Sequence, residues 1–439
     1  MAFIIKRREA IILGSAAAAM AMARSANGQS IPTAAATPPK LDIEKGASLR
    51  ILRPARFVEP DEVIFRANTA KFAKEKGVEV RVDFVGWEDI RQQTAVSANT
   101  GAGPDIVLGW AEDPHIYADK LLEVSDVAEY LGKKYGGWAP SGVAYGKRGN
   151  KWLGIPVAAS GGLVNYRVAA MQKCGFKEFP KDLAGFRELI KGLKQNGTPA
   201  GMALGHATGD ANGWLAWALW AHNAYTVDKD NKVTINSPET AKALEYVKSL
   251  YENFIPGTIS WNDSSNNKAF LAGQLHLTTN GISIYVAAKK ENPAIAADMD
   301  HAHLPVGISG QVREQHLGFP ILIFNFTKYP QACKAFTAFL MEGPQFNPWI
   351  EAAQGYLSHF LLAYDANPIW TVDPKNTPYR DVAKLASTPA GRGTLNESAA
   401  AAIADFVVVD MFANYCSGRE DIKGAMASAE RQFKRIYRT

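Results

Sequence analysis

The sequence predicts an α/β protein of two domains, and two observations carry this prediction. Residues 78–84 alternate apolar and polar side chains, the period of a half-buried strand, and they follow an amphipathic stretch that Gly77 ends. About 400 residues remain after the N-terminal segment, more than one hydrophobic core usually organises. We therefore expect two domains, each an open sheet flanked by helices.

The first domain begins with a strand–helix–strand unit. Residues 49–52 form an apolar strand, and Pro60 and Asp61 introduce a helix whose Phe65 and Phe72 lie on one face. The strand over 78–84 completes the unit. Such a unit is parallel and right-handed in nearly all proteins. A second helix from Trp87 to Ala98 and a third strand over 105–108 extend the sheet.

The second domain is predicted from further helical patterns. An amphipathic helix is indicated by Leu183, Phe186 and Ile190 at helical spacing. Residues 237–239, Ser-Pro-Glu, combine a capping hydroxyl, a first-turn proline and an acid, which is typical of a helix start. The tail over 399–438 is helical by composition, with a break near Gly418.

The N-terminus has the composition of a secretory signal peptide. Three basic residues, 6–8, precede an apolar, alanine-rich run over 10–23, which is too short to span a bilayer. Small residues at 21 and 23 fit a cleavage site, so we expect residues 1–26 to be removed. The paired arginines resemble a twin-arginine signal, although Ala10 stands where that motif usually has Phe, so the Tat and Sec routes both stay open. The cleavage region has no cysteine for lipid anchoring.

Composition narrows the function of the exported chain. The proline-rich residues 27–47 predict a flexible tether. Of the net charge of +5, residues 1–26 supply +3, which leaves no basic excess of the kind that binds nucleic acid. The three cysteines, 174, 333 and 416, form no CxxC pair, so we expect buried thiols rather than a redox or zinc site.

Short fragments in a fixed order give the chain a family resemblance. The set spans nearly the whole exported chain and comprises 71–80 (KFAKEKGVEV), 103–107 (GPDIV), 110–113 (WAED), 154–157 (GIPV), 270–274 (FLAGQ), 280–281 (NG) and 329–332 (YPQA). This order resembles family 1 extracellular solute-binding proteins of ABC importers, which include maltodextrin-binding proteins. The resemblance implies a monomeric periplasmic protein that delivers a small solute to membrane permeases.

The resemblance also implies the two-lobed periplasmic binding protein fold, type II-like, with lobes made of discontinuous segments. We expect 48–157 plus 279–316 in the N-terminal lobe and 158–278 plus 317–439 in the C-terminal lobe. The connecting crossings are expected near 157–160, 277–280 and 315–318. Ligand then lies between the lobes, outside the carboxyl ends of the parallel strands.

Three candidate ligand-binding residues lie in the first lobe. Trp110 directly follows the third strand and could stack on a sugar ring, or lie in the core beneath its loop. Asp113 could accept hydroxyl hydrogen bonds, or cap the following turn. Trp87, after the second strand, could form a second aromatic surface or simply lie on the protein surface.

The remaining candidates come from the crossings and the second lobe. Asn212 and Trp214 lie in or beside the polar loop over 206–214, whereas Trp217 and Trp220 at helical spacing are predicted core residues. The other candidates are Ser160, Asn280 and Tyr356. Ser283 is a further position at which the sequence departs from maltodextrin-binding proteins. Ser160 and Ser283 stand where maltodextrin-binding proteins have an acid and a stacking Trp, which implies a smaller or differently shaped ligand such as a monosaccharide, disaccharide or polyol.

No catalytic or cofactor motif stands out. The sequence contains no GxxxxGK[ST], GxSxG or HExxH, so we expect no enzyme activity, no cofactor and no metal; His301 and His303 are the one metal-like pair. The expected function is capture of a sugar or polyol. A non-sugar solute such as an organic cation, or an exported carbohydrate-active enzyme, stay as alternatives.

Overall fold

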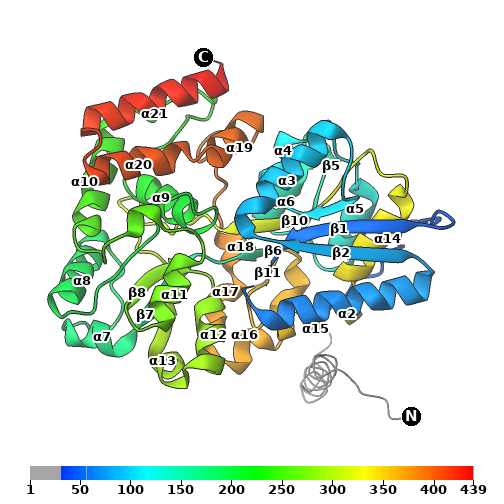
Figure 1. The fold of residues 1–439 in the computed structure, drawn as a ribbon, viewed down its shortest axis with the longest axis horizontal. Helices are drawn as coiled ribbons and strands as arrows, with labels where there is room; N and C mark the ends of the chain where they lie inside the picture. Colours follow the sequence, from blue (N-terminus) through cyan, green and yellow to red (C-terminus); the bar gives the residue numbers. More distant parts are fainter. Residues whose placement is uncertain (1–30, 56, 439) are drawn as a thin grey trace, which may run out of the picture.

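The structure is a computed structural model that describes residues 31–55 and 57–438. The expected signal peptide, residues 1–26, lies outside the described residues. Within them the strands form two sheets and a short hairpin (Figure 1). The first sheet has the order β11-β6-β10-β3-β1-β2 and the second the order β8-β7-β9.

The strand bounds are as follows. The first sheet contains β1 Ser48–Pro54, β2 Glu79–Val85, β3 Ile106–Leu108, β6 Ile155–Ser160, β10 Leu317–Ile323 and β11 Ser358–His359. The second sheet contains β7 Leu163–Arg167, β8 Leu277–Asn280 and β9 Met299–Ala302; the hairpin is β4 Lys147–Arg148 and β5 Lys151–Trp152. Strand β1 pairs in parallel with β2 and β3, so the predicted first unit is confirmed.

Two groups of helices cover the two sheets. Around the first sheet lie α2 Glu59–Lys76, α3 Trp87–Thr100, α4 Asp113–Ile116, α5 Ser125–Lys134, α6 Pro140–Gly146, α14 Pro330–Met341, α15 Gly343–Ala352, α16 Ile369–Val372, α17 Thr377–Arg380 and α18 Val382–Leu385. With the second sheet lie α7 Val168–Lys173, α8 Leu183–Gln195, α9 Asp210–Ala221, α10 Pro238–Tyr251, α11 Ser265–Leu271, α19 Glu397–Ala404, α20 Val407–Ser417 and α21 Ile422–Tyr437. Between them lie α12 Ser283–Glu291 and α13 Pro293–Asp298. Short 3-10 turns are η1 Thr258–Ser260, η2 Leu362–Ala366 and η3 Pro374–Asn376.

The helices begin and end at the residues that the sequence indicates. Gly77 ends α2 with φ 65° and its N–H donates to the Ala73 carbonyl, a left-handed cap that favours glycine. The Ser237 hydroxyl accepts from the Thr240 N–H at 3.2 Å at the start of α10. These local signals are confirmed because capping depends on residues close in sequence.

Two hydrophobic cores accompany the two sheets. In the first, Phe65 and Phe72 of α2 meet Phe336 of α14 edge to face, with ring centroids 6.3 and 5.2 Å apart. In the second, Phe186 of α8 meets Trp217 of α9 in the same way at 6.0 Å. Residues 217 and 220 are buried there, as predicted. Each lobe therefore has its own core.

The chain passes between the lobes where strands of different sheets follow one another. The first passage is 161–162, between β6 and β7, and another is 303–316, between β9 and β10. A later passage over 386–396 returns the chain to the second core, and the sequence did not predict it. In Figure 1 the C-terminal helices, drawn in red, accordingly lie on the second lobe.

Strand β10 changes the expected division of the chain. It pairs with β3 and β6, so 317–323 belongs to the first sheet rather than opening the second lobe. The helices α12 and α13 bury Ile284 and Ile295 in the first core. We propose lobes of 48–160 plus 317–385, and 163–280 plus 299–302 plus 397–437, with α12 and α13 between them.

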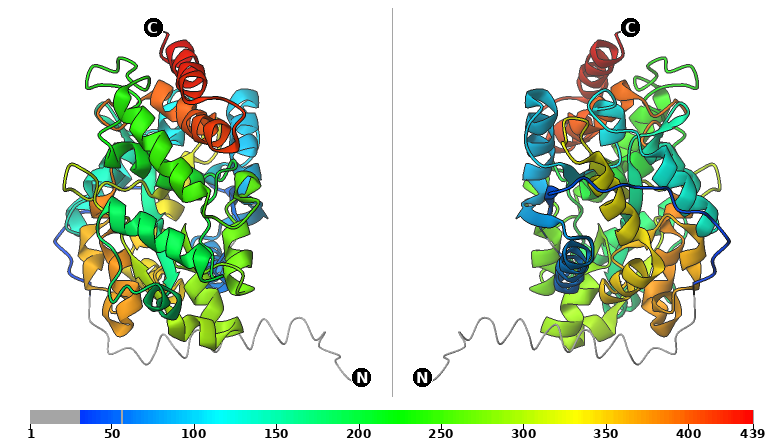
Figure 2. Two further views of the ribbon diagram at one scale, coloured as in Figure 1. Left: turned by 90° about the vertical axis from the view of Figure 1, so that its left-hand side faces the viewer. Right: turned by 90° about the vertical axis from the view of Figure 1, so that its right-hand side faces the viewer.

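The expected tether differs from the structure over its described part, 31–47. The Ala34 N–H donates to the Lys134 carbonyl at 2.8 Å, and the Glu44 carboxylate accepts from the N–H groups of Gln331 and Ala332 at the start of α14. This segment, dark blue in Figure 2, packs along the first lobe because its apolar side chains and Glu44 find partners there.

Residues 397–417 are long and apolar enough to cross a membrane by length and composition alone. In the structure they form α19 and α20, which meet at Phe406 in the left-handed conformation, φ 54°. Half of the stretch is buried, and Val407, Val409 and Phe412 belong to the second core. These residues are therefore buried in the way that core helices of a folded lobe are.

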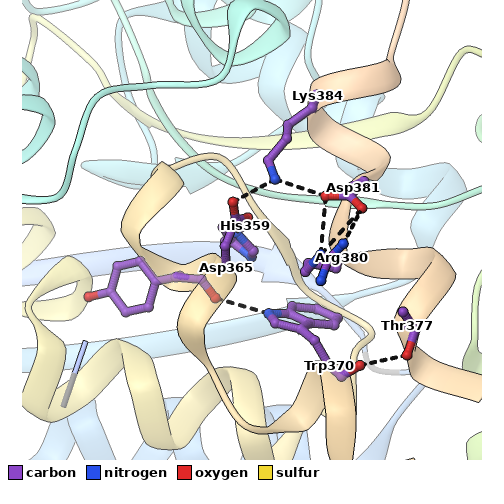
Figure 3. Close-up of polar contacts among 8 residues, drawn as sticks. His359, Asp365, Trp370, Thr377, Arg380, Asp381 and Lys384 are labelled. Carbon is purple, nitrogen blue, oxygen red and sulfur yellow. Dashed lines mark hydrogen bonds and ion pairs between the residues drawn. The ribbon is translucent and has the colours of Figure 1, made fainter. Parts of the chain in front are cut away.

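One polar cluster fixes the passages, and a second lies within the first lobe. Glu314 is buried beside 303–316, where its carboxylate contacts His303 Nδ1 at 2.9 Å and accepts from the Leu304 N–H at 2.8 Å. The Gly162 N–H donates to His316 Nδ1 at 3.1 Å, which joins the first passage to the later one. Figure 3 shows a second cluster, in which Lys384 contacts both Asp365 and Asp381.

Candidate functional site

A cavity of about 360 Å³ lies between the lobes. Both lobes and the passages supply lining residues, which are Phe57, Trp87, Ser160, Gly162, Gly209, Asp210, Asp263, Asn280, Gly281, Ser283, Leu317 and Tyr356.

Aromatic rings form the first-lobe side of this cavity. Phe57 follows β1 and Trp87 follows β2, so both lie beyond the carboxyl ends of parallel strands. Their ring centroids are 4.7 Å apart, and Trp87 Nε1 donates to the Ala55 carbonyl at 2.8 Å, which fixes the indole. Tyr356 comes from the loop after α15. These rings offer apolar faces of the kind that stack on sugar rings.

Carboxylates form the second-lobe side. Asp210 is the first residue of α9, and Asp263 lies just before α11. One Asp263 oxygen accepts from the N–H groups of Gly209 and Asp210 at 3.0 and 2.9 Å, a favourable place for an anion at a helix N-terminus. Asp210 Oδ2 accepts from Asn266 Nδ2 at 2.7 Å. Both carboxylates are thereby oriented toward one space.

The two carboxyls bind protons more readily than exposed ones. The pKa of Asp263 is raised to about 6, because burial, together with the charge of Glu88, outweighs the backbone hydrogen bonds that lower this pKa. Burial and the charge of Asp263 raise the pKa of Asp210 well above its usual value. Within the described ranges, no lysine or arginine forms an ion pair with either group. The pair therefore retains a proton more readily than exposed carboxylates do, and it can offer a ligand a hydroxyl donor as well as acceptor oxygens.

The passages add neutral polar groups. Asn280 Nδ2 donates to Asn267 Oδ1, and Asn267 Nδ2 donates to the Ser283 hydroxyl at 3.0 Å. Ser160 ends β6 at the same level of the cavity. Ser160 precedes the first passage, and Asn280 and Ser283 flank residues 281–282, where the chain leaves β8 for α12 in the first core, so a ligand touching them also touches segments that join the lobes.

Four of the candidate residues line this cavity: Trp87, Ser160, Asn280 and Tyr356. Trp110 does not, because it is fully buried behind Trp87 with its ring centroid 5.0 Å from that indole. Trp110 therefore lies where the alternative prediction, a core residue beneath its loop, places it. It supports the Trp87 ring from beneath instead of facing the cavity.

Asp113 is also outside the cavity. It is fully buried as the first residue of α4, and its Oδ2 accepts from the Trp110 N–H of the preceding loop at 2.7 Å, so it fixes that loop and makes no capping hydrogen bond to α4 itself. Its neighbours are the ion pair of Arg91 and Glu112. Burial raises the pKa of Asp113 to about 7, while Arg91 lowers this pKa and Glu112 raises it.

Asn212 and Trp214 face away from the cavity. Asn212 lies two residues after Asp210 on α9, about 200° around the helix, and it lines a different cavity within the second lobe. Its side chain donates to the Thr208 carbonyl at 3.1 Å. Trp214 is buried, with Nε1 donating to the Ala203 carbonyl at 2.7 Å. Helix geometry explains why the loop was located correctly while these two residues do not face the cavity.

The sequence reasoning missed Asp210, Asp263 and Phe57. Asp210 belongs to the polar loop over 206–214 that the sequence predicts beside the ligand, and its place at a helix start is a local signal for it. Asp263 comes from a separate loop, and its approach to the α9 N-terminus is a tertiary contact that no local pattern contains.

The paired histidines have protein partners. His301 Nδ1 contacts the Lys375 carbonyl at 3.0 Å, and His303 contacts Glu314 as above. Over the described residues, no group of three or more His, Cys, Asp or Glu side chains is arranged to hold a metal ion.

A family comparison decides the class of protein. The model of the bacterial extracellular solute-binding protein family matches residues 67–378. The chain belongs to this family. Curated relatives of this solute-binding protein include a probable ABC transporter-binding protein of Deinococcus radiodurans, 24% identical over 194 residues. That match covers 42% of this chain and 46% of the relative, so the chain spans about half of that protein's length.

A second relative is matched over more of its length. YcjN of Escherichia coli, whose name assigns it provisionally to the periplasmic-binding proteins of ABC transporters, is 24% identical over 306 residues. This match covers 65% of the present chain and 67% of YcjN.

Solved structures confirm the two-lobed α/β fold. A solute-binding protein of Thermotoga lettingae bound with α-D-tagatose has a TM-score of 0.76 at 17% identity, covering 89% of this chain and 100% of that one. A sugar transporter of Arthrobacter chlorophenolicus with bound laminaribiose gives 0.76 at 17%, covering 89% and 99%. A solute-binding protein of Agrobacterium vitis with bound D-mannitol gives 0.72 at 16%, covering 90% and 99%.

Proposed function

We propose that this solute-binding protein captures a neutral sugar or polyol in the cavity between its lobes and delivers it to the permease subunits of an ABC transporter. The observation that carries this proposal is the lining of the cavity, in which aromatic rings of the first lobe lie opposite two carboxylates of the second lobe. Rings stack on the apolar face of a sugar, and carboxylates accept hydrogen bonds from its hydroxyls. Capture before import requires an exported protein, which the basic and apolar N-terminus supports.

Ligand binding across the cavity also supplies a reason for closure. Trp87 and Phe57 come from the first lobe, and Asp210 and Asp263 from the second. A solute that contacts both sides is bound more tightly when the lobes approach, and only this difference in affinity shifts the population toward the closed form. The closed form is the one we expect the permeases to recognise.

A thermal-unfolding screen of the mature protein tests the proposal. The probes are D-mannitol, ribitol, D-tagatose and laminaribiose, each over a range of concentrations. A ligand at 100 times its Kd adds about 2.7 kcal/mol to the free energy of unfolding, so at least one probe is expected to raise Tm with concentration. If every neutral probe leaves Tm unchanged, the proposal is wrong.

Replacement of Asp210 tests the site itself. Asp210→Asn keeps the shape of the side chain but replaces one carboxyl oxygen by an NH2 group, and a buried ligand hydroxyl that loses its acceptor costs about 1–3 kcal/mol. We expect the affinity for the probe found above to fall by about tenfold or more in calorimetric titration. The matched control is Asp113→Asn, which removes a buried carboxylate outside the cavity and should leave affinity unchanged.

One observation favours an organic cation as second candidate. Asp210 and Asp263 combine with aromatic rings, and such a set also binds quaternary ammonium groups. Choline in the same thermal screen separates the two solute classes. A Tm rise with choline and none with the neutral probes would replace the sugar proposal by the cation one.

A further inference from the structure

Three of the passages between the lobes meet at one point beside the cavity. The Gly162 N–H of the first passage donates to His316 Nδ1 at 3.1 Å. Two residues before His316, the Glu314 carbonyl accepts from the Ser387 N–H of the return passage at 2.8 Å. Gly162 and Leu317, the residue after His316, both line the cavity. This point therefore connects the segments that join the lobes to the place where we propose that the solute binds.

The side chain of His316 is held in place by polar neighbours. It is fully buried, and its Nε2 lies 3.3 Å from a Glu314 carboxylate oxygen. The same oxygen contacts His303 Nδ1 at 2.9 Å, and the other Glu314 oxygen accepts from the Leu304 N–H at 2.8 Å. A neutral imidazole has one N–H and one acceptor nitrogen, and the hydrogen bond made by one nitrogen sets the state of the other. The carboxylate beside Nε2 therefore favours a hydrogen there, which leaves Nδ1 free to accept from Gly162.

The first passage has few features of its own that fix its backbone. It consists of Gly161 and Gly162, and residues without a Cβ adopt many backbone conformations. Gly161 is required by close packing, because a Cβ there would lie 2.6 Å from Val382 Cγ2. Over the described residues, His316 is the one side chain that hydrogen-bonds to this passage. The hydrogen bond between Gly162 and His316 thus selects one conformation among those that the glycines allow.

We propose that His316 is a positioning residue for the solute site. Its Nδ1 holds the first passage in the conformation that places the aromatic rings of the first lobe opposite the carboxylates of the second. The imidazole does not line the cavity, so it acts through the arrangement of the lobes and makes no contact with the solute. The inference rests on the proposed function for its effect on affinity, whereas its effect on the lobes without solute is independent of that function.

Loss of this hydrogen bond should weaken binding although every residue that lines the cavity is kept. When only a fraction of the molecules has the binding arrangement, the observed Kd is raised by the reciprocal of that fraction. The net contribution of one hydrogen bond shifts such an equilibrium by roughly threefold to tenfold. We expect a loss of affinity of this size.

Two amide substitutions separate the roles of the two imidazole nitrogens. The side-chain oxygen of Asn lies near the position of Nδ1, so His316→Asn keeps an acceptor for Gly162, whereas the longer Gln reaches toward the position of Nε2. Calorimetric titration with the solute found by the thermal screen should show a Kd raised roughly threefold to tenfold in His316→Gln and by less than about twofold in His316→Asn. His316→Leu has no acceptor and should lose as much as His316→Gln.

Small-angle X-ray scattering without solute tests the arrangement of the lobes by itself. We expect a larger radius of gyration for His316→Gln and His316→Leu than for the wild type, and the wild-type radius for His316→Asn. Saturation with the solute should bring all four proteins to one radius, because the solute then supplies the contacts that hold the lobes together.

The matched control is His303→Gln. This change removes a contact to the same Glu314 carboxylate but leaves the hydrogen bond between Gly162 and His316. Thermal unfolding should show a lower Tm for this variant, while its Kd and its radius without solute stay at the wild-type values. The control therefore separates a loss of stability from a change in the arrangement of the lobes.

The outcomes distinguish the two proposals. Equal Kd values and equal ligand-free radii for the wild type and His316→Gln would overturn the positioning role and leave the proposed function standing. Losses in His316→Asn as large as those in His316→Gln would also overturn it, because the acceptor at the Nδ1 position would then not be what matters. If no probe binds the wild-type protein, the proposed function fails, and the ligand-free radii still decide the role of His316.

Discussion

At the scale of single residues, chemically similar side chains have different roles around the cavity. Trp87 and Trp110 lie 5.0 Å apart, yet one lines the cavity and the other supports it from behind. Asp210 and Asp113 are both acids that burial protonates more readily, yet only Asp210 faces the cavity. Residue type alone therefore identifies the neighbourhood of a site, and packing decides which member reaches the ligand.

Asp113 gives a prediction about stability. Its pKa is about 7 in the folded protein against an ordinary 3.8, so between these values the folded state binds a proton that the unfolded state does not. The stabilisation is complete below the unfolded pKa and is lost as pH rises through about 7. Asp113→Asn removes this titration. The free energy of unfolding of the variant minus that of the wild type should therefore be greater at pH 8 than at pH 5.

Urea unfolding of both proteins at pH 5 and pH 8 measures this difference. Midpoints at the two pH values give the change in free energy of unfolding between variant and wild type. The same change at both values would show that Asp113 is ionised throughout, and that Arg91 outweighs its burial.

Much of the candidate site could be predicted where the signal is local. Trp87 lines the cavity because a residue directly after a parallel strand lies at the carboxyl edge of the sheet, and the strand over 79–85 was readable from its alternation. Asn280 and Ser160 were reached through family-like fragments beside the passages. The choice of Asn212 over Asp210 missed only the 200° turn between residues two apart on a helix.

At the scale of elements, the passages between lobes hold most of what the sequence could not show. Strand β10 enters the first sheet between β3 and β6, a pairing set by contacts more than 150 residues apart. Apolar periodicity identifies such a strand but not its partners. The return of the chain over 386–396 to the second core likewise depends on tertiary packing of α19 to α21.

The buried contacts of Glu314 allow a prediction of how much one passage between the lobes contributes to the free energy of unfolding. Its side chain is 1% exposed and contacts His303 and the Leu304 N–H, so Glu314→Ala leaves buried donors unpaired. We expect the free energy of unfolding to fall by about 3 kcal/mol, measured by urea unfolding at neutral pH. Glu314→Gln keeps an acceptor for Leu304 and should lose less.

A more exposed cluster provides the comparison. Lys384 contacts Asp365 and Asp381, but each of these side chains is about one-third exposed (Figure 3). Solvent screens such pairs, so Lys384→Met should cost less than about 1 kcal/mol. If Lys384→Met cost more than Glu314→Ala, burial would not be what makes the Glu314 contacts strong.

At the scale of the whole molecule, the proposed function requires the two cores, which are joined by passages, to approach each other around a solute. Each lobe packs its own apolar side chains, and the cavity between the lobes takes its lining from both lobes and from the passages. The aromatic side alone, or the carboxylate side alone, makes half of the contacts that we propose for the solute. Closure brings the two halves together around it.

Small-angle X-ray scattering of the mature protein, without ligand and saturated with the solute found by the thermal screen, tests this account most directly. We predict a smaller radius of gyration with the solute, and a radius for Asp210→Asn that stays at the ligand-free value when the same solute concentration leaves most of the variant unbound. A solute that binds by calorimetry while the radius stays unchanged would contradict the account, because binding would then not join the two lobes.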